Sequence, residues 1–264
     1  MTPFFLEAGE GRRFCIHRQP EGQVKGAILF VPPFAEELNK SRRMVALQAS
    51  AFAGAGYAVL SIDLLGCGDS SGDFGEARWE AWMGDLALAC DWLRRRHGTP
   101  LTLWGLRFGA LLGLEFARAS GERFERCLLW QPMASGEACL AQFMRLRLAG
   151  ERLAGEKVTT QQLRAELEES GSLEIAGYAL SRDVAANMER LKLAELGLPG
   201  IPHGWFEISA QPMAPASARI VESWKQRGIS CETATVPGEP FWSTQEISEC
   251  PALIEETLGC LRKS

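Results

Sequence analysis

The chain has 264 residues, of which 46% are hydrophobic and 23% charged. It carries 28 Lys and Arg against 33 Asp and Glu, so its formal net charge at pH 7 is −5. This composition excludes a disordered, collagen-like or coiled-coil chain, and the acidic balance argues against nucleic acid as a partner. No stretch has the pattern of a signal peptide or the length of a membrane span, so we expect a cytoplasmic protein without an integral membrane segment.

The eight cysteines are not spaced like zinc ligands, since none forms a C-x-x-C pair or stands near a histidine at ligand spacing. Most of them lie inside apolar stretches, where free buried thiols are more common than disulfides in a chain of this size. We therefore expect no metal site, and nothing in the sequence calls for a cofactor.

The first predicted elements are two short strands over residues 4–8 and 12–18, joined by a turn at 9–11. The apolar run Val24–Val31 then resembles a strand that is buried on both faces of a parallel sheet. Strands and helices alternate after it. The helices are expected from Asn39 to Gly54, at 78–97 and at 108–120, and the strands at 57–64, 100–104 and 124–131.

Such alternation predicts right-handed crossovers and a mostly parallel sheet with helices on both faces. Residues 135–198 contain no convincing strand and are predicted to form helices, at 139–153, after the capping box Thr159-x-x-Gln162, and at 181–193. The sheet resumes with strands at 205–209 and 231–236, each followed by a helix. We expect a core formed by 1–135 and 199–264, with 136–198 inserted as a helical cap over the carboxyl edge of the sheet.

The segment Gly105-Leu106-Arg107-Phe108-Gly109 has the glycine spacing of the nucleophile elbow G-x-S-x-G, between a strand and a helix as that motif requires. The glycine-rich loop Asp63–Ser70 is a common companion of the elbow. With this strand order and the cap, nearly the whole chain resembles the α/β-hydrolase superfamily. The resemblance implies an α/β-hydrolase fold.

The catalytic positions depart from the superfamily pattern. Arg107 stands where the nucleophile belongs, and a guanidinium neither attacks a carbonyl nor loses its proton in a protein. The resemblance places the base histidine in the loop 237–242 and the acid in 210–213, and neither segment has the required residue. The histidines that the chain does contain are expected to be structural, and they are His17, His97 and His203. Ordinary Ser-His-Asp hydrolysis is therefore not expected.

Three further segments carry a narrower resemblance. They are PPFAEELNKSRR at 32–43, GLRFG at 105–109 and GEPFW at 238–242. This combination is similar to the second hydrolase-like family associated with the exosortase A system, which accompanies exopolysaccharide production and the sorting of PEP-CTERM proteins in Gram-negative bacteria. The resemblance implies a role in cell-envelope or exopolysaccharide biosynthesis.

Arg107 is expected at the start of a helix, where the helix dipole disfavours a cation, so an anion should compensate it. The acidic residues in the neighbouring loops are Glu36, Glu37, Asp69 and Glu239. In one interpretation a carboxylate pairs with Arg107 and merely holds the loops together, and we favour it slightly because buried arginines usually find carboxylates. In the other, Arg107 and helix N–H groups bind an anionic ligand.

Three functions remain open. The first is an accessory or ligand-binding protein of an exosortase or exopolysaccharide system, which lacks the triad. The second is an unconventional hydrolase of ester, thioester or acyl substrates that uses carboxylates around Arg107, and the third is a structural partner of an active hydrolase. The expected partners are thus a small anionic or acyl ligand and a second hydrolase-like protein.

The catalytic residues stay unassigned at this stage. The candidates for catalysis are Glu36, Glu37, Glu239, Cys67 and Ser70, and the candidates for ligand binding are Arg107, Phe34, Glu36, Phe108 and Trp242. Without a histidine beside them, the thiol of Cys67 and the hydroxyl of Ser70 have no evident means of activation.

Overall fold

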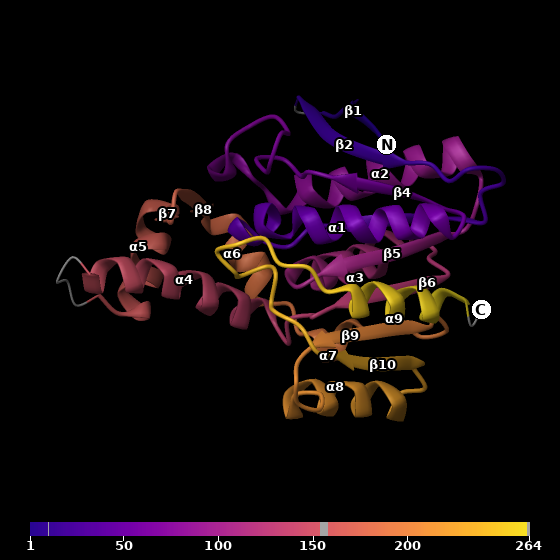
Figure 1. Cartoon of the computed structure of the whole chain (residues 1–264). Coiled ribbons are helices and arrows are strands. Elements are labelled where there is room, and N and C mark those ends of the chain that lie inside the picture. The colour runs from indigo at the N-terminus through magenta and orange to yellow at the C-terminus, as the bar shows by residue number, and fades with distance from the viewer. Residues whose placement is uncertain (10, 154–157, 263–264) are drawn as a thin grey trace.

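The computed structural model describes residues 1–9, 11–153 and 158–262, and an eight-stranded sheet forms its centre (Figure 1). The strand order is β1-β2-β4-β3-β5-β6-β9-β10. β1 and β2 pair antiparallel, as do β2 and β4, and the six strands from β4 to β10 in this order are parallel neighbours. The strands are β1 (Thr2–Glu7), β2 (Arg12–Arg18), β3 (Gly26–Val31), β4 (Tyr57–Ile62), β5 (Leu101–Leu106), β6 (Arg126–Trp130), β9 (His203–Ile208) and β10 (Cys231–Val236).

Helices cover both faces of the sheet, as the alternating pattern predicts (Figure 1). α1 and α9 lie on one face, where they contribute Met44 and Leu253 to one buried cluster. α2, α3 and α8 lie on the other face, where they contribute Trp82, Phe116 and Trp224 to a second cluster. The bounds of these helices are α1 (Glu36–Gly54), α2 (Trp79–His97), α3 (Phe108–Ser120), α8 (Pro215–Gln226) and α9 (Pro251–Arg262). The predicted α/β class with a mostly parallel sheet is confirmed.

β3 shows why the apolar run of the sequence is continuous. Ala27, Leu29 and Val31 belong to the buried cluster beneath α2 and α3, whereas Ile28 and Phe30 belong to the cluster beneath α1 and α9. Because successive side chains of a strand point to opposite faces, a strand covered on both sides needs apolar residues at every position.

Between β6 and β9 the chain leaves the sheet. We call residues 136–198 the insert; its residues 154–157 lie outside the described part of the chain, as does residue 10 in the turn predicted at 9–11. α4, α5, α6 and the strand pair β7–β8 lie beyond the carboxyl ends of the sheet strands, at the left of Figure 1. The elements of the insert are α4 (Gly136–Leu153), α5 (Thr160–Ser170), β7 (Ser172–Ile175), β8 (Tyr178–Ser181), α6 (Arg182–Glu189) and α7 (Leu193–Leu196).

The prediction that the insert is entirely helical is wrong. β7 and β8 form an antiparallel pair in which Leu173, Ile175 and Leu180 are buried, while β7 alternates strictly between exposed and buried positions. The turn residues Ala176 and Gly177 both have positive φ, as a two-residue hairpin turn requires. Because Ala-Gly is not the usual Asn-Gly or Asp-Gly signal and each strand has only four residues, the sequence pattern is weak here. The capping box at Thr159 is confirmed, since its side chain accepts a hydrogen bond from the Gln162 backbone N–H.

α1 also begins earlier than predicted, at Glu36 in place of Asn39. Ala35 precedes it with φ 49° and ψ −123°, so the chain turns sharply out of the Pro32-Pro33 segment. Glu36 and Glu37 therefore lie in the first turn of a helix, where the dipole favours acidic side chains. No helix in the described part of the chain is long and apolar enough to span a membrane.

Candidate functional site

The turn between β5 and α3 has the geometry of the nucleophile elbow that the sequence predicts. Arg107 has φ 56° and ψ −118°, a conformation that L residues rarely adopt. A Cβ on Gly105 would lie 2.7 Å from the backbone N of Ala110, and one on Gly109 would lie 2.3 Å from the carbonyl O of Val31. The two glycines thus permit the close packing of strand, turn and helix that aims residue 107 out of the sheet.

The Arg107 side chain is enclosed by residues from three other parts of the chain. Its Nη2 lies 3.1 Å from Oε1 of Glu37 in α1, and its Nε donates to the same oxygen, also at 3.1 Å. Nη2 further donates to Oε1 of Gln142 in α4 at 2.9 Å. The guanidinium carbon lies 5.2 Å from the ring centroid of Trp242, in the loop after β10, which is within cation–π range. We call these four residues the Arg107 cluster.

Burial shapes the electrostatics of the Arg107 cluster. Arg107 is only 8% exposed and Glu37 only 6%. Loss of water raises the pKa of Glu37, while the charge and hydrogen bonds of Arg107 lower it in part. The amide of Gln142 also donates to Oε1 of Glu37, at 3.4 Å, so one carboxylate oxygen meets donors from both neighbours. The internal ion pair that we favoured for Arg107 is therefore present, with Glu37 as its acid.

The other acidic candidates lie differently. Asp69 and Glu239 are exposed and do not join the Arg107 cluster. Glu36 is half-buried, and no other side chain of the described residues forms a hydrogen bond or ion pair with it. Loss of water raises the pKa of its carboxyl, and the charge of Arg107 only partly offsets this rise.

Cys67 and Ser70 lie in the glycine-rich loop after β4. The Ser70 hydroxyl donates to the Asp63 carbonyl at 2.5 Å and accepts from the Phe14 backbone N–H at 2.8 Å, so it ties this loop to β2. Burial raises the pKa of the Cys67 thiol, which opposes formation of a nucleophilic thiolate. The geometry gives both residues a structural place.

The aromatic candidates separate into two groups. Phe34 packs edge to face against Phe74, Phe108 and Phe143, with ring centroids 5.1–5.6 Å apart. The cavity beside Phe34 and Phe108 has a volume of about 10 Å³, at the lower limit for a single water. Phe34 and Phe108 thus fill the space next to the elbow, whereas Trp242 covers Arg107.

The three histidines lie where the sequence predicts, away from the Arg107 cluster. His203 is the first residue of β9, at the amino edge of the sheet. His17 in β2 and His97 at the end of α2 face each other, with their Nε2 atoms 3.0 Å apart. In the described part of the chain, no three His, Cys, Asp or Glu side chains are grouped so that they could hold a metal ion.

Two polar residues near the strand ends were not found from the sequence. Gln142 lies in the predicted helix 139–153, and a lone amide in such a helix has no motif to mark it. Glu207, within β9, is the carboxylate nearest in sequence to the expected acid segment 210–213. It is 3% exposed and accepts hydrogen bonds from Nε1 of Trp205 and the backbone N–H of Ala214. Because Trp205 packs on Trp224 of α8, Glu207 faces α8.

Comparisons with known proteins agree with the fold. Residues 16–196 match the family model described as serine aminopeptidase, S33. No curated protein sequence matches the chain.

Several solved structures are similar over almost the entire chain. The ferulic acid complex of Est1E from Butyrivibrio proteoclasticus has a TM-score of 0.70 at 14% identity and covers 98% of both chains. A thermostable carboxyl esterase from Bacillus coagulans has a TM-score of 0.69 at 13% identity, covering 99% of this chain and 98% of its own. Mouse alpha/beta hydrolase domain-containing protein 10 has a TM-score of 0.67 at 15% identity, covering 100% of this chain and 98% of its own. At these identities the likeness establishes the α/β-hydrolase fold alone.

Proposed function

The chain belongs to the serine aminopeptidase S33 family of α/β hydrolases, and from that premise we propose that it is a member without Ser-His-Asp chemistry, which serves as an accessory or ligand-binding protein. The observation that supports this proposal most directly is the Arg107 cluster. The nucleophile's position holds a cation whose Nε and Nη2 are engaged by Glu37 and Gln142 and whose face is covered by Trp242. A side chain held in this way neither attacks a carbonyl nor leaves room for an ester beside it.

We further propose that the protein acts in the cytoplasm, in an exosortase or exopolysaccharide system. The three segments that resemble the exosortase-associated family supply Glu37, Arg107 and Trp242, and these residues meet in one cluster. The shared motifs thus describe one physical unit. Deletion of the gene should abolish exopolysaccharide formation or PEP-CTERM sorting in the native host; unchanged polymer and sorting would contradict the role.

A hydrolase assay tests the loss of triad chemistry. The wild type and Arg107→Ser are incubated with p-nitrophenyl butyrate, an acyl thioester and an aminoacyl p-nitroanilide. We expect no turnover above the buffer rate for either, because Arg107→Ser restores a hydroxyl in the elbow but brings no histidine to it. Arg118→Ser, an exposed change on α3, controls for the substitution itself. Activity gained by Arg107→Ser alone would show that a usable base exists.

An unconventional hydrolase is the second candidate, and the environment of Glu36 favours it. Glu36 is half-buried beside the Arg107 cluster, and burial raises the pKa of its carboxyl, as a general acid or base requires. Nearby, burial and then the Glu36 charge raise the pKa of Tyr178, in β8 of the insert. If the wild type turns over any substrate of the assay and Glu36→Gln abolishes that turnover while Glu239→Gln does not, this candidate replaces the accessory role.

A further inference from the structure

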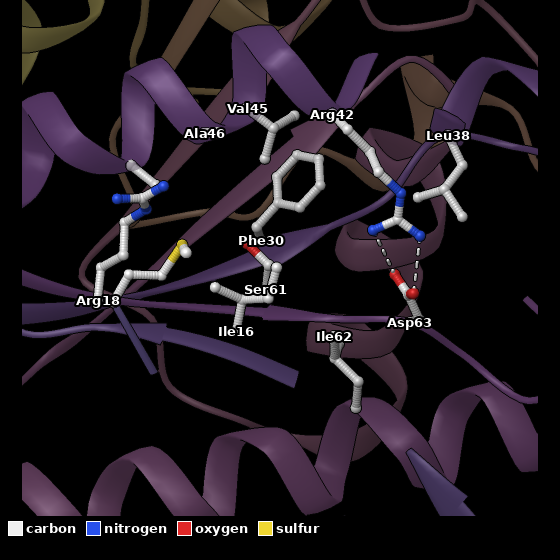
Figure 2. Close-up of a pocket in the computed structure, with 12 residues that line it drawn as sticks. Ile16, Arg18, Phe30, Leu38, Arg42, Val45, Ala46, Ser61, Ile62 and Asp63 are labelled. Carbon is white, nitrogen blue, oxygen red and sulfur yellow. Dashed lines mark hydrogen bonds and ion pairs between the residues drawn. The ribbon is translucent and has the colours of Figure 1, made fainter. Parts of the chain in front are cut away.

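A second cavity lies on the α1 face of the sheet, between that helix and strands β2, β3 and β4 (Figure 2). Its volume is about 90 Å³. Most of its wall is apolar and comes from Ile16, Phe30, Leu38, Val45, Ala46 and Ala49. The cavity is thus separate from the small space beside Phe34, although Leu38 contributes to the walls of both.

The small side chains of Ala46 and Ala49 explain why the space is left open. Together with Val45 they lie within about one turn of α1, on the side that faces the strands. On β2, Ile16 and Arg18 point to the same face, opposite Ser61 and Val59 of β4. The alanine side chains do not reach across the gap to Ile16 and Arg18 of β2, so a hollow remains where a leucine would close it.

The charged groups of the cavity stand at its two ends (Figure 2). At one end Nη2 of Arg42 lies 2.9 Å from Oδ2 of Asp63, an oxygen that also accepts from the Asp69 backbone N–H at 3.0 Å. The negative charge of Asp63 is therefore balanced. At the other end Arg18 is half-buried, and its guanidinium has no hydrogen-bond or ion-pair partner among the described residues.

We propose that this cavity binds a short-chain monocarboxylate, with its apolar chain inside and its carboxylate on Arg18. A half-buried guanidinium without a partner among the described residues is a ready partner for a carboxylate, because it can donate two parallel hydrogen bonds to it. A single water needs about 10–15 Å³ of such space, so about 90 Å³ admits a chain of roughly six non-hydrogen atoms. The apolar wall disfavours phosphate or sulfate, whose oxygens would lack donors there.

Sodium hexanoate is the probe, and its dissociation constant is measured by saturation-transfer NMR on the full chain. Hexanoate should bind saturably, whereas acetate, which lacks the chain, and 1-hexanol, which lacks the charge, should bind at least about tenfold more weakly. Dodecanoate should not bind better than hexanoate, because its additional carbons find no wall to contact. Arg18→Gln should weaken hexanoate binding about tenfold and leave hexanol binding unchanged.

Ala46→Leu should abolish the binding of both hexanoate and hexanol by filling the cavity. The matched controls are Ala51→Leu, on the same helix outside the cavity wall, and Arg95→Gln, an exposed arginine of α2; neither should change the dissociation constant. Absence of saturable binding to the wild type, or equal binding of hexanoate to the wild type and Arg18→Gln, overturns the proposal. Circular dichroism of each variant separates lost binding from lost folding, and the result is independent of the Arg107 cluster.

Discussion

Arg107 is held by contacts from α1, from the insert and from the loop after β10. Desolvation of two charges is costly, and their attraction offsets that cost only when hydrogen bonds satisfy both partners. Here Nε and Nη2 of Arg107 meet acceptors, and the Trp242 ring supplies the guanidinium with a polarisable face. The stability of this cluster therefore depends on keeping both charges or removing both.

Glu37→Gln tests the ion pair. The neutral amide leaves the Arg107 charge buried and unpaired, so we expect a loss of about 3 kcal/mol in the free energy of unfolding, measured by urea denaturation. Glu37→Leu combined with Arg107→Met should cost less than the two single changes added together. Glu115→Gln, which breaks the more exposed pair with Arg118 on α3, should cost under about 1 kcal/mol. A Glu37→Gln variant as stable as the Glu115→Gln control would contradict a coupled buried pair.

At the scale of elements, the turn between β5 and α3 has the backbone geometry of the nucleophile elbow with Arg107 at its centre. Gly105 and Gly109 allow α3 to pack directly on β5 and on the end of β3. The positive φ of Arg107 costs on the order of 1–3 kcal/mol and persists only because this packing imposes it. The motif is thus maintained by the packing of strand and helix, whatever side chain it carries.

Gly109→Ala should destabilise the protein by about 3 kcal/mol or more, since the new Cβ would lie 2.3 Å from a backbone oxygen that cannot move alone. Thermal and urea unfolding give the measurement. Gly54→Ala is the matched control: it is the last residue of α1, and a Cβ there meets nothing within 4 Å. That control should be neutral or more stable by up to about 1 kcal/mol. Equal effects of the two changes would mean that the elbow tolerates a side chain at 109.

At the scale of the whole molecule, the histidines make stability depend on pH. Burial, and then the charges of His97 and Arg96, lower the pKa of His17 to about 4, and burial lowers that of His203 to about 4 as well. In the unfolded chain each titrates near 6.5. The unfolded state therefore binds more protons than the folded state between these pH values. The contribution of the two neutral histidines to the free energy of unfolding is complete above about pH 6.5 and is lost as the pH falls toward 4.

His17→Gln isolates one contribution. When both rings are neutral, one Nε2 donates to the other across the 3.0 Å contact between β2 and α2. Protonation of both rings leaves two donors facing each other. Between pH 7 and pH 5 the wild type should lose about 1–2 kcal/mol more unfolding free energy than His17→Gln, as measured by urea denaturation at each pH. Parallel pH profiles for the two proteins would contradict the assignment.

Local pattern was sufficient to predict most of the fold. The run Val24–Val31, the alternation of strands with amphipathic helices and the G-x-x-x-G spacing around Arg107 are short-range signals, and the structure confirms each. Local pattern failed where its signals were weak: the β7–β8 turn is Ala-Gly, and α1 begins at Glu36 without a side-chain cap. Neither error concerns the eight-stranded sheet, whose apolar strands give the stronger pattern.

The sequence by itself determined that an arginine stands in the elbow and that no histidine stands in the loop after the last strand. Only the tertiary structure decided which acid pairs with Arg107, because the sequence places Glu36, Glu37, Asp69 and Glu239 in loops expected at the same edge of the sheet and does not distinguish among them. The first turn of α1 directs Glu37 to the elbow, and Gln142 reaches it from a helix 35 residues further along. The cavity at Arg18 also depends on the tertiary structure: β2, β3, β4 and α1 enclose it together, and no segment alone encodes an empty space.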